Sequence, residues 1–390
     1  MDKKEVPPGW QHHRLGHLGT WLSGGTPSKT APDLWKGDIP WVSPKDMKRP
    51  RLWDALDHIS QQSIGKGGHL APAEALLIVV RGMILAHSAP IARAETSLAF
   101  NQDIKALVLR STYDSNFMLW WLSWKQNAIL NIATESTHGT KRIPTDSLFG
   151  MTVSLPPLPE QRAIATALTD VDDLLTSLDR LIAKKRAIKQ GVMRDLLTGR
   201  RRLPGFSGEW QLKRLGDVAV IVMGQSPTSL HYNIRGDGLP LIQGNADVSN
   251  RRTIKRVFTT QITKRGLFGD ILMSVRAPVG KVSRALFDLC LGRGVCALRF
   301  PNDFLYHFMI FHEPMWDKHS QGSTFDSVNS DQVHNVELLL PAEPSEQRAI
   351  AAVLTDMDDE IDALQARRDK THAIKQGMMA ELLTGRTRLV

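Results

Sequence analysis

The chain has 390 residues, 42% of them apolar and 23% charged, which is the composition of an ordinary globular protein with room for more than one core. Residues 1–8 contain no apolar signal region, and the longest clean apolar run, residues 75–80, is far too short to cross a bilayer. The net charge of +9 and isoelectric point near 9.6 favour a polyanionic partner without identifying one.

In chain order, residues 1–152 predict a first globular domain. Short apolar runs at residues 39–42, 76–80 and 104–109 alternate with glycine and proline breaks, and a tryptophan-rich helical stretch follows at residues 116–132. Mixed signals of this kind predict an α+β domain.

Residues 153–200 predict a long helix. Prolines at 156, 157 and 159 and then Glu160 mark its start, where a carboxylate complements the helix dipole, and Gly199 is a terminating glycine. At roughly 1.5 Å per residue, about 38 residues would form a rod of about 57 Å. Its apolar positions step by four and three, which predicts a narrow coiled-coil seam. The seam residues are Ile164, Leu168, Val171, Leu175, Leu178 and Ile182.

A basic segment at residues 184–186 separates this seam from further apolar positions at Ile188, Val192 and Leu196. We therefore expect the helix to be interrupted in its middle. Residues 201–338 predict a second globular domain and residues 339–390 a second long helix, ending at Gly385. The seam of the second helix comprises Ile350, Leu354, Met357, Ile361 and Leu364.

The two helical stretches are near copies of each other. Residues 160–200 align with residues 346–386 without a gap at an offset of 186, sharing Glu-Gln-Arg-Ala-Ile-Ala, Ala-Ile-Lys-Gln-Gly and Leu-Leu-Thr-Gly-Arg. The globular domains correspond only faintly, as in Gly-Gly-Thr-Pro-Ser at residues 24–28 against Gly-Gln-Ser-Pro-Thr at residues 224–228. The helices thus stayed alike while the domains diverged.

This order of domain, helix, domain and helix resembles the specificity subunit of type I restriction-modification enzymes. The resemblance rests on Leu-Pro-Pro-Leu-Pro-Glu-Gln-Arg-Ala-Ile-Ala at residues 155–165 and on residues 187–200, and it covers nearly the whole chain. It implies two target-recognition domains held apart by an antiparallel coiled coil, each reading one half of a split double-stranded DNA site. It also implies docking of two modification methyltransferase subunits and, through them, the restriction subunits.

Two similar antiparallel helices would carry a pseudo-twofold axis, so the domains would present equivalent faces to one duplex, as two-fold dimers do with half-sites. We expect the helix length to set the length of the unread spacer between the half-sites.

Candidate DNA contacts are polar and basic side chains in loops, because phosphates fix register and base edges need donors and acceptors. A solvated surface explains any single one of them equally well, so the clusters carry the prediction. In the first domain they are Ser28, Lys29, Lys45, Lys48, Arg49, Arg81, Lys141 and Arg142. In the second they are Gln225, Gln243, Asn245, Arg251, Arg252, Lys255, Arg256, Arg276, Ser323 and Thr324.

The helices carry further charged groups. Residues 184–202 hold eight Lys or Arg against one acidic residue, which suits either contact with spacer DNA or a solubilising surface. Asp170, Asp172 and Asp173, repeated as Asp356, Asp358 and Asp359, are interpreted as partner-facing or solvent charges and not as a metal site. Gly191 and Gly377 each cost a helix about 1 kcal/mol, which a bend, a close helix approach or simple tolerance would explain.

The chain lacks the signatures of an enzyme acting alone. Asp33, Asp46 and Lys48 imitate a nuclease pattern, but their counterparts at an offset of 200 are Asn233, Ala246 and Val248. Residues 24–30 match a phosphate-binding loop only loosely, and neither a glycine-rich cofactor fingerprint nor an Asn-Pro-Pro-aromatic motif occurs. We expect no catalytic residue, metal or cofactor in this chain; the resemblance assigns S-adenosylmethionine, ATP and Mg²⁺ to partner subunits.

Cys290 and Cys296 are the only cysteines, and their spacing fits no common zinc site, so we expect both in the core of a cytoplasmic protein. Two functions remain open. The favoured one is a non-catalytic scaffold that reads DNA sequence. The alternative is a coiled-coil assembly protein whose basic domains bind nucleic acid without sequence preference or bind another partner.

Overall fold

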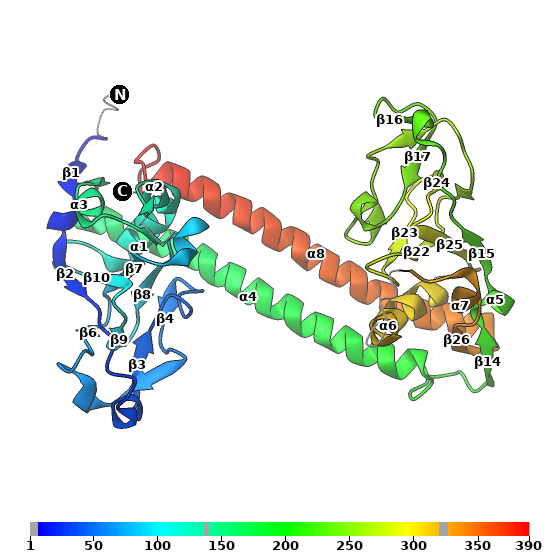
Figure 1. Cartoon of the computed structure of the whole chain (residues 1–390), viewed down its shortest axis with the longest axis horizontal. Helices are drawn as coiled ribbons and strands as arrows, with labels where there is room; N and C mark the ends of the chain where they lie inside the picture. Colours follow the sequence, from blue (N-terminus) through cyan, green and yellow to red (C-terminus); the bar gives the residue numbers. More distant parts are fainter. Residues whose placement is uncertain (1–6, 136–139, 320–326, 390) are drawn as a thin grey trace. The chain divides into compact units, whose positions relative to one another are not determined.

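The computed structural model describes residues 7–135, 140–319 and 327–389. The chain forms two compact units, the first from residues 1–179 with 366–390 and the second from residues 180–365 (Figure 1). Each unit therefore combines one predicted globular domain with part of both long helices. The predicted α+β class is confirmed, because every unit contains antiparallel and mixed sheets beside helices.

The first unit is built on two sheets whose strands alternate in the chain. The five-stranded sheet has the order β2 (Gly19–Ser23), β10 (Ile104–Leu109), β7 (Leu76–Val79), β8 (Ile91–Ala94) and β4 (Arg51–Leu52). The four-stranded sheet has the order β5 (Asp57–Ile59), β3 (Ile39–Val42), β9 (Leu98–Phe100) and β6 (Leu70–Ala71). Two ribbons complete it, β1 (Gln11–Arg14) with β13 (Thr152–Leu155) and β11 (Thr134–Glu135) with β12 (Lys141–Arg142).

The second unit repeats this strand order with small additions. Its six-stranded sheet runs β15 (Val220–Met223), β25 (Val295–Arg299), β22 (Ile271–Ser274), β23 (Val282–Arg284), β19 (Arg252–Thr253) and β18 (Val248–Ser249). Its five-stranded sheet runs β16 (Tyr232–Asn233), β20 (Phe258–Thr259), β17 (Leu239–Ile242), β24 (Leu289–Leu291) and β21 (Arg265–Gly266). The remaining ribbon pairs β14 (Trp210–Arg214) with β26 (Glu337–Pro341).

Short helices cover these sheets. The predicted tryptophan-rich helix is confirmed as two pieces, α1 (Ser115–Trp124) and α2 (Gln126–Asn131), and α1 packs against β7 and β8. The side chain of Asp114 caps α1 by accepting a hydrogen bond from the Phe117 N–H, which satisfies one of the otherwise unpaired amides of the first turn. The other short helices are α3 (Thr145–Phe149), α5 (Leu215–Val218), α6 (Phe304–His319) and α7 (Ser330–His334).

The two long helices are continuous. Helix α4 spans Leu158–Leu197 and α8 spans Pro344–Leu382. The predicted interruption at the basic segment is therefore wrong. Lysine side chains in that region reach across to the other helix, where Lys185 Nζ lies 2.6 Å from a carboxylate oxygen of Glu360 and Lys189 pairs with Asp358. At the basic segment, ion pairs therefore take over the contact between the two helices, and neither helix ends there.

Eight of the eleven predicted seam residues are buried, and the other three, Val171, Met357 and Leu364, are partly buried. Beyond the basic segment, however, Ile188 and Ile374 face outward, with 44% and 49% of their surface exposed. Lys189 and Lys375 occupy the inner positions there, so the next isoleucine along the helix is turned away from the contact.

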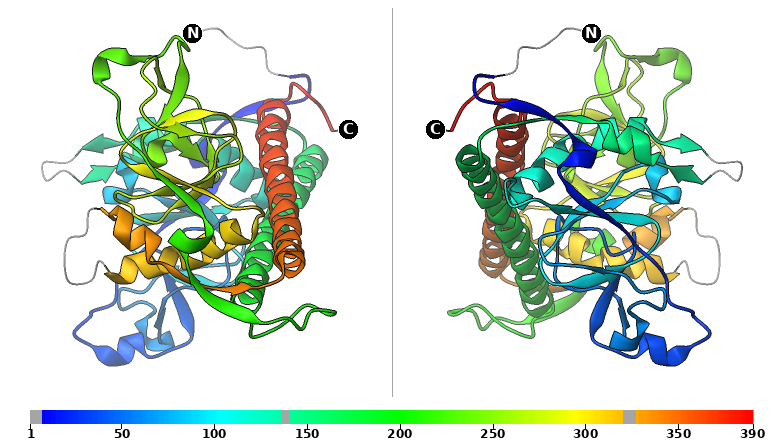
Figure 2. Two further views of the ribbon diagram at one scale, coloured as in Figure 1. Left: turned by 90° about the vertical axis from the view of Figure 1, so that its right-hand side faces the viewer. Right: turned by 90° about the vertical axis from the view of Figure 1, so that its left-hand side faces the viewer.

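Within each unit the two helix segments run antiparallel (Figures 1 and 2). In the first unit, Lys375 Nζ lies 2.5 Å from Asp172 and Arg368 Nε lies 2.9 Å from Asp179, so residue numbers rise on one helix as they fall on the other. Lys185 and Lys189 pair in the same falling order with Glu360 and Asp358 in the second unit. Asp172 and Asp358 were interpreted as partner-facing or solvent charges, and that was wrong, since both bind lysines of this chain.

The repeated Glu-Gln pair at each helix start anchors the helix to its domain. In the first unit, Gln161 accepts a hydrogen bond from the Asp114 N–H at 2.9 Å and donates one to the Pro156 carbonyl at 2.8 Å. In the second, Gln347 accepts from Asn302 at 2.9 Å and donates to Pro341 at 2.7 Å. The repeated sequence thus fixes the same helix–domain joint twice.

The glutamate beside each of these glutamines forms a bidentate ion pair with an arginine that follows the other long helix. Arg388 donates to Glu160 at 2.6 and 2.7 Å, and Arg202 donates to Glu346 at 2.6 and 2.7 Å. Both carboxylates are almost fully buried, with side-chain exposures of 2% and 1%. Each unit is therefore closed by a charged pair between the start of one helix and the end of the other.

Gly191 and Gly377 lie in open positions of the helices. A Cβ atom built on either would meet no heavy atom within 4 Å, so a close helix approach does not explain them. We expect Gly191→Ala and Gly377→Ala each to raise the free energy of unfolding by about 1 kcal/mol, the helix-propensity difference between the two residues. Urea unfolding of the full chain checks this; a loss of stability would show that the glycines have another structural role.

Two further expectations are met. Gly199 and Gly385 have positive φ angles of 68° and 71° just after their helices, as terminating glycines do. Cys290 and Cys296 are fully buried, and burial raises the pKa of Cys296 to about 12. Among the described residues, every helix is too short or too polar to cross a membrane.

Candidate nucleic-acid interface

In the first unit, strand directions bring several loops to one edge of the five-stranded sheet. Strands β2 and β7 end at this edge and β10 begins there, with Lys105 opposite Ser23 and Ile104 opposite Val79. Strand β3 ends beside them, because Val42 pairs with Phe100 just before the turn into β10. The segments 24–30, 43–49 and 80–83 therefore leave the sheets side by side.

Hydrogen bonds link these segments into one surface. Thr26 bonds to the side chain of Gln102 at 2.5 Å, and the N–H groups of Val80 and Arg81 donate to the carbonyl of Asp103. Arg81 forms a backbone bridge with Arg142 of β12. Seven of the eight predicted residues are exposed here and Lys141 is partly buried. The sequence-predicted contacts of this unit thus lie at one edge, in connected loops and in β12.

The cations on this edge differ in their partners. Lys45 Nζ lies 2.7 Å from Asp57, and this hydrogen bond raises the pKa of Lys45 above its ordinary value. In the described part of the chain, the other six predicted cations form no side-chain ion pair or hydrogen bond: Lys29, Lys48, Arg49, Arg81, Lys141 and Arg142. Six guanidinium or ammonium groups are consequently available to phosphates at this edge.

The second unit presents the equivalent edge. Hydrogen bonds from Gly224 to Val295, from Gln225 to Leu291 and from Gly292 to Ile242 hold the corresponding loops together. Gln225, Gln243 and Arg276 are exposed on them, and Asn245 is partly buried and donates to the Pro278 carbonyl at 3.4 Å. Arg276 forms a bridge with Ser327, as Arg81 does with Arg142. Ser323 and Thr324 lie outside the described residues.

Glycine is required at the start of both edges. A Cβ on Gly24 would lie 2.0 Å from the Asn101 carbonyl oxygen, and one on Gly224 would lie 2.1 Å from that of Gly292. The faint repeat at residues 24–28 and 224–228 therefore reflects a close contact between two backbone segments, which only glycine permits.

The basic segment after β18 is held by the protein itself. Arg251 donates from both terminal nitrogens to Glu313 of α6, and Arg252 pairs with Asp362 of α8 at 3.4 Å. Arg256 donates to the Ala246 carbonyl at 2.7 Å, and Lys255 lies over the Phe287 ring. Arg256 thus bonds to the residue that follows Asn245, and the density of basic residues in the sequence overstates the available charge.

Sequence reasoning missed two groups at these edges. Arg293 is exposed on the loop after β24, and its N–H donates to Ser226 of the opposite loop. Trp53 and Leu56 are exposed beside Lys48 and Arg49, with 57% and 72% of their surface accessible. No periodic pattern predicts that Trp53 is exposed. The charged and turn-forming residues around it, however, could have indicated an exposed loop. Among the described residues, no cluster of three His, Cys, Asp or Glu side chains could hold a metal ion.

Comparisons with known proteins place these two units in one family. The family model described as the type I restriction modification DNA specificity domain matches residues 7–189 and again residues 207–371. The chain belongs to this type I specificity family.

Its relatives agree with this assignment. The putative type I restriction enzyme MjaX specificity subunit of Methanocaldococcus jannaschii is 30% identical over 68% of this chain and 66% of its own length. The EcoR124I/EcoR124II specificity subunit of Escherichia coli is 31% identical over 47% of this chain and 46% of its own length. The type I restriction-modification S subunit from M. genitalium, at 14% identity, shares the fold with a TM-score of 0.66 over 97% of both chains. The aligned region thus leaves a third or more of each of the two sequence relatives unmatched.

Proposed function

We propose that this specificity-family chain recognises a split double-stranded DNA target, with one unit reading each half-site. The supporting observation is the same sheet edge in both units, built by the same strand order and glycine approach but carrying unlike side chains. The first edge presents mainly cations, Lys29, Lys48, Arg49 and Arg81, while the second adds amides, Gln225 and Gln243. One scaffold with two sets of side chains suits two different half-sites.

The two kinds of side chain have separate tasks in this proposal. Lysine and arginine groups at the loop ends bind phosphates and fix the register of the duplex, whereas the amides and arginines that enter the major groove read base edges. Because several cations are free, binding is expected to weaken steeply as salt increases.

We further propose that the helices dock two copies of a modification methyltransferase subunit, which in turn carry the restriction subunits. The motif Ala-Ile-Lys-Gln-Gly occurs identically in α4 and α8, and its isoleucine, Ile188 or Ile374, is about half exposed in each. Gly191 and Gly377 lie one turn further along with open space beside them. Identical exposed apolar groups on two helices suit two identical partners, in contrast to the diverged edges.

In this proposal the chain performs no catalysis. Its partners bind S-adenosylmethionine, ATP and Mg²⁺ and carry out methylation and cleavage in the cytoplasm, while this chain positions them on DNA. Residues 184–202 contribute less to DNA contact than their charge suggests, because Lys185, Lys189 and Arg202 form ion pairs within the chain.

Methylation mapping tests the proposal directly. Genomic DNA from cells with the chain and its partner subunits is expected to carry a methylated motif of two half-sites and an unread spacer, absent from cells without the chain. Adding one heptad to both α4 and α8 is expected to change the spacer and leave both half-sites unaltered. An unchanged spacer would show that the length of the helices does not set the length of the spacer.

Competition with random duplex addresses sequence preference. A specificity subunit is expected to bind its mapped target at least about 10³-fold more tightly than random DNA. Equal affinity would instead support a protein that binds nucleic acid without reading its sequence.

A further inference from the structure

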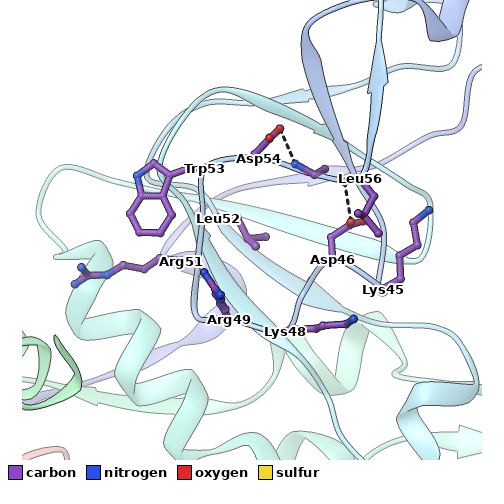
Figure 3. A pocket seen from close by; sticks show the side chains of 10 residues that line it. Lys45, Asp46, Lys48, Arg49, Arg51, Leu52, Trp53, Asp54 and Leu56 are labelled. Carbon is purple, nitrogen blue, oxygen red and sulfur yellow. Dashed lines mark hydrogen bonds between the residues drawn. The ribbon is translucent and has the colours of Figure 1, made fainter. Parts of the chain in front are cut away.

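The first unit contains a concavity of about 430 Å³. The corresponding loop of the second unit has different side chains. Figure 3 shows it between the segment 45–51 and the loop 53–56. Leu52 and Ala55 contribute apolar surface, Trp53 and Leu56 stand on either side, and Lys48 and Arg49 lie along the rim. Its volume falls within the range of small-ligand sites.

The loop that exposes Trp53 is held in place. Asp46 accepts hydrogen bonds from the Leu56 N–H at 3.0 Å and from the N–H of Ser43 at 2.9 Å. Asp54 accepts from the Ala55 N–H at 2.9 Å and pairs with His58 at 2.7 Å, and these contacts lower the pKa of Asp54. The two carboxylates therefore shape the loop and keep their charges engaged with N–H groups.

The backbone on the other side of Trp53 is fixed as well. Thr96 donates to the Trp53 carbonyl at 3.2 Å, and the Glu95 N–H donates to the Leu52 carbonyl at 2.8 Å. Trp53 remains 57% exposed on this fixed backbone. Its indole therefore offers solvent a flat aromatic surface, on which a base can stack.

Charge around the indole favours an anionic occupant. In the described residues, Lys48 and Arg49 have no side-chain partner, and both line the concavity. The nearby carboxylates are occupied by the loop. A flat apolar surface next to two free cations matches the two halves of a nucleotide, a base that stacks and a phosphate that pairs.

The equivalent loop of the second unit lacks these features. Four residues separate β4 from β5 and four separate β19 from β20, so the two loops correspond in length. The second loop carries Ile254 in place of Trp53, and Ser249 and Asn250 stand at the positions of Lys48 and Arg49. The loop's own cations, Lys255 and Arg256, are turned onto Phe287 and the Ala246 carbonyl. Of these two loops, only the one after β4 therefore combines an exposed aromatic ring with unpaired cations.

We propose that this concavity binds a single unpaired nucleotide of the DNA held by the first unit, with its base stacked on Trp53 and its phosphate on Lys48 and Arg49. This inference rests on the proposed DNA-binding function and adds to it the recognition of an extrahelical base. The site adjoins the reading edge, since Lys45 and Asp46 belong both to the segment that leaves β3 and to the wall of the concavity. A base displaced from a bound duplex could therefore enter it without leaving the protein surface.

Bulged DNA provides a direct test. The full chain, purified with the subunits it assembles with, is titrated with a labelled duplex containing one unpaired thymidine, with the fully paired duplex and with a duplex bearing an abasic residue at the bulge. We expect the thymidine bulge to bind about tenfold more tightly than paired DNA, in the range that base–aromatic stacking supplies. The abasic bulge should lose most of this gain.

Variants separate stacking from charge. Trp53→Ala is expected to bring the affinity ratio of bulged to paired DNA to about one, Trp53→Phe to retain part of it, and Ile254→Ala in the second unit to leave it unchanged. Replacing both Lys48 and Arg49 by glutamine should reduce the ratio and its dependence on salt. Because Trp53 is exposed, its variants should melt at the temperature of the parent chain.

Three results would overturn the inference. They are an equal affinity of the parent for bulged and paired DNA, a gain that survives in Trp53→Ala, or an equal loss on both DNAs in that variant, which would place Trp53 in the groove of an intact duplex. Failure to bind any DNA would instead contradict the proposed function itself.

Discussion

Replacing Arg202 by alanine is expected to lower the free energy of unfolding of the second unit by about 3 kcal/mol, the cost of leaving a buried charge unpaired. Glu346, its bidentate partner, has a side-chain exposure of only 1% and sits in the first turn of α8. The remaining contact to this carboxylate, from Trp210 Nε1 at 3.4 Å, is long and cannot replace a guanidinium.

Urea unfolding followed by circular dichroism measures this effect. Arg201→Ala is the matched control, because the neighbouring Arg201 is exposed and should change stability by under about 0.5 kcal/mol. Glu346→Gln in the Arg202→Ala background should recover part of the loss by removing the unpaired charge. Equal stabilities of the two arginine variants would show that the ion pair does not hold the unit together. Arg388→Ala should destabilise the first unit in the same direction.

Acidification is expected to destabilise the second unit through His307. This imidazole is 1% exposed, and burial followed by the positive charge of Lys189 lowers its pKa to about 4, against the opposing carboxylates of Asp358 and Asp303. Arg284 lowers it further. His307 is therefore neutral in the folded chain at pH values where the unfolded chain binds a proton.

The direction of the effect follows from this difference. Stability is retained above the unfolded pKa of about 6.5, falls by about 1.4 kcal/mol per pH unit below it, and levels off near the folded value. Between pH 7 and pH 5 the loss should be about 2 kcal/mol. The variant His307→Gln can still reach Thr355, which bonds to Nε2 at 3.0 Å, and should lack this part of the pH dependence. Parallel stability curves for parent and variant would contradict the assignment.

In the first unit, a tryptophan takes the place of His307 in the contact with the long helix. Thr169 and Asp172 are the counterparts of Thr355 and Asp358 at the offset of 186. There Trp120 donates to Thr169 at 3.1 Å, and the ammonium of Lys375 lies over its ring at 4.1 Å. Tryptophan does not titrate in this pH range, so the acid sensitivity expected from His307 is confined to the second unit.

Local periodicity and repetition were sufficient to predict the two long helices and the α+β class. Strands β3 and β10 coincide with their predicted apolar runs, because a buried strand needs only a short continuous apolar sequence. The same reasoning failed at residues 184–186, where lysines were taken as a break. A lysine side chain is long enough to cross a helix interface. Whether it meets a carboxylate there depends on the sequence of the facing helix, which the local pattern does not contain.

Contacts distant in sequence could not be predicted from single positions. The pair Arg202 with Glu346 joins residues 144 positions apart, although the repeat of Arg202 as Arg388 at the offset of 186 was a visible hint. In the interface, residue type correctly indicated exposed loops at Lys29 and Arg81. It did not distinguish them from Arg251, whose charge is matched by Glu313 of a helix more than 50 residues downstream.

The order of synthesis affects the two units unequally. The core of the second unit is complete within residues 180–365, whereas that of the first takes Met379, Leu382 and Leu383 from the end of α8. The first unit must therefore wait for the end of α8 to be made, and until then Ile164 and Leu168 lack part of their core cluster. A chain released after residue 365 would therefore contain the whole core of the second unit, beside an amino-terminal unit still open to chaperones.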